Sequence, residues 1–191
     1  MSSTAVEIPG YLAGTWTIDP GHSEVAFTVH MMMVGKVRGH FTRFRGELVL
    51  AADPLASMVT ATIESDSIDT NNRRRDHHLR SADFLDVQAH PRMAYRSTGI
   101  RHGDHGFVID GELTLHGVTR QVPLLLDVNG FTRDSGGGIR AGFSATAEVN
   151  RVDFGIGTSI PMGGSGVAIG DWVQISIEIQ AVLAKPQPAA A

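Results

Sequence analysis

The sequence predicts an all-β fold, an antiparallel barrel. Apolar and polar residues alternate through most of its 191 residues, and turn residues separate the alternating segments. The clearest segment is 172–183, where every second residue from 173 to 183 is apolar and every second residue from 174 to 180 is polar. This pattern is typical of a long strand with one buried face. Strands of roughly ten residues favour a closed barrel, because closure leaves no exposed strand edge.

Other segments with the same period complete the predicted barrel. The candidate strands cover 24–31, 36–44, 46–51, 58–66, 92–100, 107–115, 121–131 and 139–149. Turn residues lie between them, at Asp53-Pro54, 102–106, His116-Gly117 and 134–138. We expect one barrel domain. The predicted boundaries are an N-terminal segment at 1–13, the barrel domain at 14–184 and a flexible tail at 185–191.

Residues 68–87 are charged, carry histidines and do not alternate. Within them we expect a short helical insert at about 71–85. Its helix would cover about 72–80 and begin at Asn71 or Asn72, because an asparagine side chain can accept a hydrogen bond from the first helical turn. A second irregular stretch, 151–170, is rich in glycine. Long irregular segments in compact domains are often lids or rims of a site.

The insert allows a structural and a chemical interpretation. Asp76 and Arg80 stand four residues apart, the spacing of a helical ion pair, while Leu79 and Phe84 supply apolar contacts. These features predict a helical plug or lid across one end of the barrel. The arginines at 73–75 either bind an anionic head group such as a phosphate, or are solvated and pair with nearby carboxylates.

Composition narrows the function classes. The chain has no cysteine, which excludes disulfides, thiolate nucleophiles and cysteine-ligated metals. Its net charge of −4 argues against nucleic acid as a partner. No apolar segment approaches the roughly 20 residues that a membrane-spanning helix needs. The first ten residues lack the basic start and apolar run of a signal peptide, so we expect a cytoplasmic protein.

Candidate catalytic and metal-binding groups are few. His77 and His78 would point about 100° apart on a helix, and His102 and His105 fall in a predicted turn. With no recognised ligand spacing among the nine histidines, we expect no metal and no cofactor. Asp19, His22 and Ser23 are the residue types of a catalytic triad, but within one turn they predict a hydrogen-bonded corner instead.

Several blocks resemble the YceI-like family, in order, over about residues 14–183. They are Trp16-Thr-Ile-Asp19-Pro-Gly-His22-Ser23, Val37 to Gly46, Ile68-Asp69-Thr70, Arg75 to Val87, Gly111 to Thr119 and Arg151 to Gly155. The resemblance implies an eight-stranded antiparallel lipocalin-like barrel that holds a polyisoprenoid, an isoprenoid quinone or another long-chain lipid. It also implies a homodimer and no established catalytic centre. Relatives usually carry histidine at the position of Met31, so here the contact with a ligand would be apolar.

The resulting hypothesis is a lipid-binding barrel, which binds, sequesters or transports its ligand and has no catalytic residue. We expect Arg75 and His77 at the cavity mouth, with Phe84 and Leu85 closing that end. The predicted ligand-binding residues are Val25, Phe27, Val29, Met31, Phe41, Ile63, Phe84, Phe107, Ile109, Phe143, Ile175 and Ile177.

Two other hypotheses remain open at this point. An enzyme acting on a small or lipidic substrate would need His22, Asp76 and His77 to converge on a cavity, with or without a metal ion. A purely structural interaction protein would instead have a packed barrel and a large exposed apolar patch.

Overall fold

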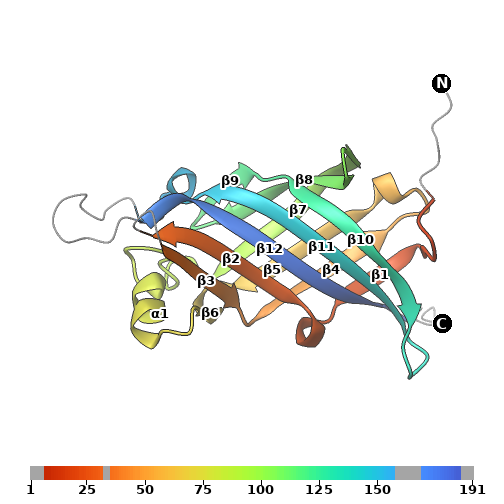
Figure 1. Ribbon diagram of the computed structural model, residues 1–191, viewed down its shortest axis with the longest axis horizontal. Helices are drawn as coiled ribbons and strands as arrows, with labels where there is room; N and C mark the ends of the chain where they lie inside the picture. Colours follow the sequence, from red (N-terminus) through yellow and green to blue (C-terminus); the bar gives the residue numbers. More distant parts are fainter. Residues whose placement is uncertain (1–6, 32–34, 158–168, 186–191) are drawn as a thin grey trace, which may run out of the picture.

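The computed structural model describes residues 7–31, 35–157 and 169–185, which form a closed, elongated eight-stranded antiparallel β-barrel (Figure 1). The predicted barrel is therefore confirmed. The strands are β1 Gly14–Ile18, β2 Glu24–Met31, β3 Gly35–Phe41, β4 Phe44–Leu50, β5 Met58–Glu64, β6 Ile68–Asp69, β7 Arg92–Gly103, β8 Gly106–Leu115, β9 Val118–Gln121, β10 Leu124–Arg133, β11 Ile139–Asn150 and β12 Ile169–Leu183. The helices are η1 Pro20–His22, η2 Pro54–Ala56, η3 Ser65–Ser67, α1 Arg73–Arg80 and η4 Arg151–Phe154.

The first part of the barrel wall is built from interrupted strands. β2 pairs with β3 and β1 pairs with β4, so β1–β2 and β3–β4 each act as one strand with a break. β5 and β6 repeat this arrangement, because β5 pairs with β4 and β6 pairs with β3. The breaks meet where Thr42 N donates to Ser67 O and Glu64 N donates to Arg43 O. We call this line of breaks the seam.

The second part of the wall is made of long strands. β7, β8, β10, β11 and β12 follow one another, and β12 closes the ring by pairing with both β1 and β2. The predicted strand 121–131 is divided here into β9 and β10, since Pro123 has no N–H to donate to a ladder. β1 was not predicted as a strand, because its five residues are too few to display a clear period.

One end of the barrel is filled by aromatic side chains. Trp16 is fully buried there, and its ring lies 5.6 Å from that of Phe131, edge to face. Tyr11, from the segment before β1, also packs edge-on against Phe131, which in turn contacts Phe143. Such edge-to-face pairs add stability beyond the area they bury. We call this group, Tyr11, Trp16, Phe131 and Phe143, the aromatic end.

The opposite end carries α1, the connection 81–90 and η4, and we call it the α1 end (Figure 1). Asn72 begins the helix as predicted, because its side chain accepts from Arg75 N. The predicted pair between Asp76 and Arg80 is wrong. Asp76 is buried and accepts from the backbone N–H and hydroxyl of Thr70, while Arg80 donates to backbone carbonyls of 66 and 68. Both side chains therefore satisfy backbone groups of η3, β6 and the residue that follows β6.

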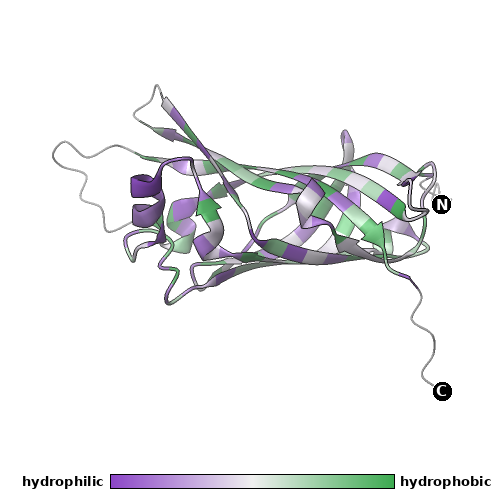
Figure 2. Cartoon of the chain, turned by 90° about the horizontal axis from the view of Figure 1, so that it is seen from below, coloured by the Kyte–Doolittle hydropathy of each residue, from purple (hydrophilic) through white to green (hydrophobic). Residues whose placement is uncertain are grey.

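The hydropathy of α1 differs from that of the barrel wall. In Figure 2, α1 is hydrophilic along its length, whereas strands show hydrophobic and hydrophilic residues in turn. Within the described ranges, no helix has the length and apolar character needed to cross a membrane.

Candidate functional site

A cavity of about 590 Å³ lies inside the barrel. Every described strand except β9 contributes inward side chains to it, and the lining extends from Ile156 and Ile169 at the α1 end to Leu50 and Ile179 toward the aromatic end. The lining is almost wholly aliphatic and aromatic, and it includes no aspartate or glutamate among the described residues. The two-residue period of the strands is the physical reason, because it turns one apolar face inward all round the ring.

The predicted ligand-binding residues mostly lie on this cavity. Those that line it are Val25, Phe27, Val29, Met31, Phe41, Ile63, Phe84, Ile109, Phe143, Ile175 and Ile177. Phe107 is the exception, and its predicted position is wrong. It lies next to the tip of the β7–β8 hairpin, where its ring stacks on its cross-strand partner His102 at 5.7 Å.

The predicted cavity mouth needs one correction. Arg75 lines the cavity, but His77 faces a separate polar depression on the surface, with Asp69, Asn72 and other residues of the insert. His78 lines the cavity instead. Adjacent helical residues point about 100° apart, so only one of the two histidines can face inward.

Polar side chains on the cavity wall gather at the α1 end. Arg75 donates through Nε and Nη2 to the hydroxyl and carbonyl of Thr70, while its Nη1 has no partner among the described residues. The His78 ring lies 3.1 Å from Asp83 through Nε2 and packs edge-on against Phe84. These contacts hold one guanidinium and one imidazole against an otherwise apolar space.

Arg151 is the second guanidinium on the cavity wall, and it is bound in place. Its guanidinium donates to the carbonyls of Gly170, Ile156 and Ile169, and to the carboxylate of Asp171 at 2.7 Å. The side chain is 15% exposed. It therefore ties η4 to the start of β12 and supplies a fixed positive charge near the opening.

Tyr95 is a buried polar residue of the cavity wall. Its hydroxyl donates to Val122 O at 3.0 Å and also lies 3.3 Å from Ile109 O. Burial raises the pKa of this phenol well above its ordinary value, so the group is neutral. The hydroxyl joins β8 to Val122, which lies between β9 and β10, where the strand ladder is interrupted. Tyr95 thus presents its ring, and not a free hydroxyl, to the cavity.

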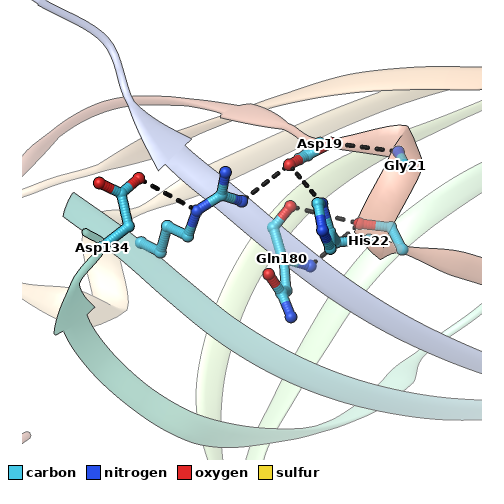
Figure 3. A network of polar contacts seen from close by, with 7 residues as sticks. Asp19, Gly21, His22, Asp134 and Gln180 are labelled. Atoms are coloured by element: carbon cyan, nitrogen blue, oxygen red, sulfur yellow. Dashed lines mark hydrogen bonds and ion pairs between the residues drawn. The ribbon is translucent and has the colours of Figure 1, made fainter. Parts of the chain in front are cut away.

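The residues proposed for catalysis do not converge. Asp76 and His77 lie on α1, His22 lies on η1, and none of the three lines the cavity. Figure 3 shows that Asp19 accepts from Gly21 N, His22 and Arg140. Ser23 bonds to the backbone of Gln180 and not to His22. The local residues form the predicted hydrogen-bonded corner.

The positive partners in this corner lower the pKa of the Asp19 carboxyl. The hydrogen bond from Arg140, 2.7 Å away, is the main cause that lowers the pKa of the Asp19 carboxyl to about 2, and His22 adds to it. Arg140 also reaches Asp134 at 3.3 Å. The network pins η1 and the β10–β11 connection together on the outside of the barrel.

Sequence reasoning missed some cavity residues. Ser57, Tyr95 and Arg151 were not selected. Tyr95 could have been found, since it shares the alternation of Met93 in the predicted strand 92–100. Arg151 opens a glycine-rich stretch in which nothing indicates the direction of a side chain.

This geometry defines a class of protein: closed antiparallel β-barrels that enclose an apolar cavity. Residues 16–181 match the family model described as the YceI-like domain, and the chain belongs to the YceI-like family. It is 36% identical over 177 residues to a UPF0312 protein of Serratia proteamaculans, covering 91% of this chain and 89% of that protein. It is 37% identical over 140 residues to Protein YceI of Escherichia coli, covering 73% of each.

Solved structures show the same fold at low sequence identity. Burkholderia cenocepacia BcnA aligns with a TM-score of 0.70 and 20% identity, over 85% of this chain and 98% of BcnA. A domain from Saccharophagus degradans, described as polyisoprenoid binding and implicated in plant cell wall breakdown, aligns with a TM-score of 0.69 and 13% identity. That alignment covers 88% of this chain and 98% of the domain.

Proposed function

We propose that this protein binds a long-chain apolar ligand of the polyisoprenoid type inside its barrel and has no catalytic role of its own. The observation that carries the proposal is the cavity, about 590 Å³ in volume and lined almost entirely by apolar side chains. Its volume lies within the range of ligand sites, roughly 300–1,000 Å³. Each methylene or methyl group buried there would contribute about 0.8 kcal/mol.

The shape of the cavity favours a chain over a compact ligand. Lining residues extend from Ile156 at the α1 end to Leu50 near the aromatic end, and on β12 they run from Ile169 to Ile179. Ten steps of about 3.3 Å each span about 33 Å along a strand. A modest volume distributed over such a length is narrow, as a linear hydrocarbon requires. The neighbour described as polyisoprenoid binding, which shares the fold, supports the same choice.

The polar groups suggest how the ligand is oriented. The cations on the cavity wall, Arg75 and Arg151, lie at the α1 end together with His78. At the other end, the Ser57 hydroxyl is already bonded to Tyr11 and to Ala51 N. A polar or anionic head group would therefore lie at the α1 end, within reach of Arg75 Nη1, and the tail would point toward the aromatic end.

Extraction of the purified full chain with organic solvent, followed by mass spectrometry, tests the proposal. We expect one class of long-chain isoprenoid lipid at about one molecule per chain, the occupancy of a single enclosed site. Recovery of no stoichiometric lipid, together with no uptake of an added polyisoprenoid, would overturn it.

A matched pair of substitutions on β11 localises the binding. Ala147 faces the cavity, whereas its neighbour Thr146 is exposed on the outer face. Ala147→Phe adds a ring to the cavity and Thr146→Phe adds the same ring outside. We expect the first variant to lower lipid occupancy several-fold and the second to leave it unchanged. Equal occupancy in both variants would place the lipid elsewhere.

A further inference from the structure

Two histidines and a carboxylate meet beside the α1 end, outside the cavity. One potential ligand atom each from Asp86, His90 and His116 lies within 4.8 Å of the others, and each residue is partly buried. The two imidazole rings are edge to face, with centroids 4.7 Å apart. In a tetrahedral site with metal–ligand bonds near 2.1 Å, ligand atoms are about 3.4 Å apart, so small side-chain rotations would complete such a site.

The backbone brings the three residues together from two separate segments. His116 and Gly117 form the two-residue turn between β8 and β9, with φ of 53° and 73°. Asp86 and His90 lie in the connection 81–90, where His90 N donates to Asp86 O at 2.8 Å. The His90 ring packs so closely over the turn that a Cβ added at Gly117 would lie 2.7 Å from it. Glycine at 117 thus permits the approach.

The hydrogen bond of His116 prepares one of its nitrogens for a metal. Its Nδ1 lies 3.0 Å from the carbonyl oxygen of Phe154. A carbonyl oxygen can only accept, so Nδ1 carries the proton and Nε2 keeps its lone pair in the neutral ring. A backbone carbonyl that fixes the tautomer in this way is a usual partner of metal-ligating histidines. Phe154 is itself buried at 2% exposure, so the acceptor is held firmly.

The other two side chains of the cluster are also free to bind a metal ion. Neither the His90 ring nor the Asp86 carboxylate makes a side-chain hydrogen bond or ion pair within the described part of the chain. Two imidazoles and one carboxylate, with no thiolate, are a ligand set for borderline divalent ions such as Zn²⁺, Ni²⁺ or Co²⁺. Three protein ligands would leave a fourth position for water.

We propose that Asp86, His90 and His116 bind a divalent transition-metal ion that ties the connection 81–90 to the β8–β9 turn. The connection supplies Phe84 and Leu85, which are buried and line the cavity at the α1 end. The β8–β9 turn belongs to the wall. An ion at this position would cross-link the two and hold the end of the barrel closed.

Calorimetric titration of ZnCl₂ into the full chain, after chelator treatment and dialysis, tests the proposal. We expect one zinc ion per chain with micromolar or tighter affinity, and a higher Tm when zinc is present in excess. His90→Gln, Asp86→Asn and His116→Asn should each weaken binding at least about 100-fold, since loss of a ligand costs more than loss of an outer partner. Asparagine tolerates the positive φ of 44° at Asp86 and 53° at His116, so both turns should be retained.

His105→Gln is the matched control, because His105 is exposed at the β7–β8 hairpin tip and belongs to no cluster. It should bind zinc as the parent chain does. The visible spectrum of the Co²⁺-loaded chain gives a second measurement that does not depend on stability. Binding weaker than about 100 µM, or zinc affinity that survives in His116→Asn with a native metal-free Tm, would overturn the site.

Discussion

The two ends of the barrel are closed by different kinds of interaction. At the aromatic end, Trp16 and Phe131 fill the space with ring contacts, and charged groups such as Arg140 and Asp19 remain on the outer surface. At the α1 end, cationic side chains line the cavity itself, and buried hydrogen bonds such as those of Asp76 hold the helix in place. The aromatic end is therefore closed by apolar packing that continues the hydrophobic core. The α1 end is closed by a helix and a connection that polar contacts hold against the barrel.

Because its two ends differ in this way, a single cavity can favour one orientation of a bound ligand. Hydrophobic burial is non-directional and contributes in proportion to area, so the aromatic end gains stability without selecting a chemical group. Hydrogen bonds are directional and costly to leave unmade, so the α1 end can be specific but is more easily opened.

Trp16→Ala should cause the largest loss of stability. The side chain is completely buried, and its removal leaves a cavity that neighbouring rings cannot fill, at a cost of about 3–5 kcal/mol. Urea denaturation would measure it. Trp172→Ala is the matched control at the α1 end of β12, where the tryptophan is 58% exposed, and it should change stability by no more than about 0.5 kcal/mol. Equal losses would remove the distinction between the two tryptophans.

Asp76→Ala should have an intermediate effect, concentrated at the α1 end. It leaves the backbone N–H and hydroxyl of Thr70 without their acceptor, a cost of about 1–3 kcal/mol. Hydrogen exchange should quicken at Thr70 and along α1 but not in β10 or β11. Asp83→Ala removes only an exposed contact with His78 of the same helix, so it should change these rates far less. Faster exchange throughout the barrel would mean that the α1 end is not a separate unit.

Acidification should weaken the outer network of the aromatic end. The folded-state pKa of Asp19 is lowered from 3.8 to about 2, so its stabilising contribution is present above pH 4 and is lost as pH falls toward 2. Because the side chain is partly exposed, we expect a contribution of only about 1 kcal/mol. Urea midpoints measured between pH 5 and pH 2 would show this loss. Asp19→Asn should make the urea midpoint depend less steeply on pH. An unchanged slope in this variant would contradict the assignment.

The smallest loss of stability is expected for an ion pair on the part of the wall that lies between the two ends. Arg96 and Glu112 form an exposed cross-strand pair at 2.8 Å on β7 and β8. Arg96→Ala should cost no more than about 0.5 kcal/mol, since exposed ion pairs are screened by water and salt. Urea denaturation of this variant gives the baseline for the others, and a loss above 1 kcal/mol would show that surface pairs contribute to closure.

Much of the cavity could be predicted from sequence because strand alternation assigns a face to each side chain. Val25, Phe27 and Ile175 were placed correctly on the cavity wall by that period alone. The rule failed at Phe107, because the face of a residue does not reveal whether the cavity extends to it. It also could not choose between His77 and His78, since that choice depends on the rotation of α1 about its axis.

Contacts between distant segments could not be predicted in the same way. The meeting of His90 with His116 depends on a turn with two positive φ angles and on the path of the connection 81–90. Neither leaves a periodic pattern in the sequence. The packing of Tyr11 against Phe131 likewise needs the closed ring, because the two residues are far apart in the chain.

The seam divides the barrel wall into a jointed side and a rigid side. β11 and β12 run past the breaks without interruption, whereas β1–β2, β3–β4 and β5–β6 in the first 69 residues are each divided there. β12 pairs with β1 on one side of the break and with β2 on the other. The fifteen-residue β12 therefore holds both segments of the first divided strand in one sheet, and a displacement of β2 relative to β1 would require β12 to bend.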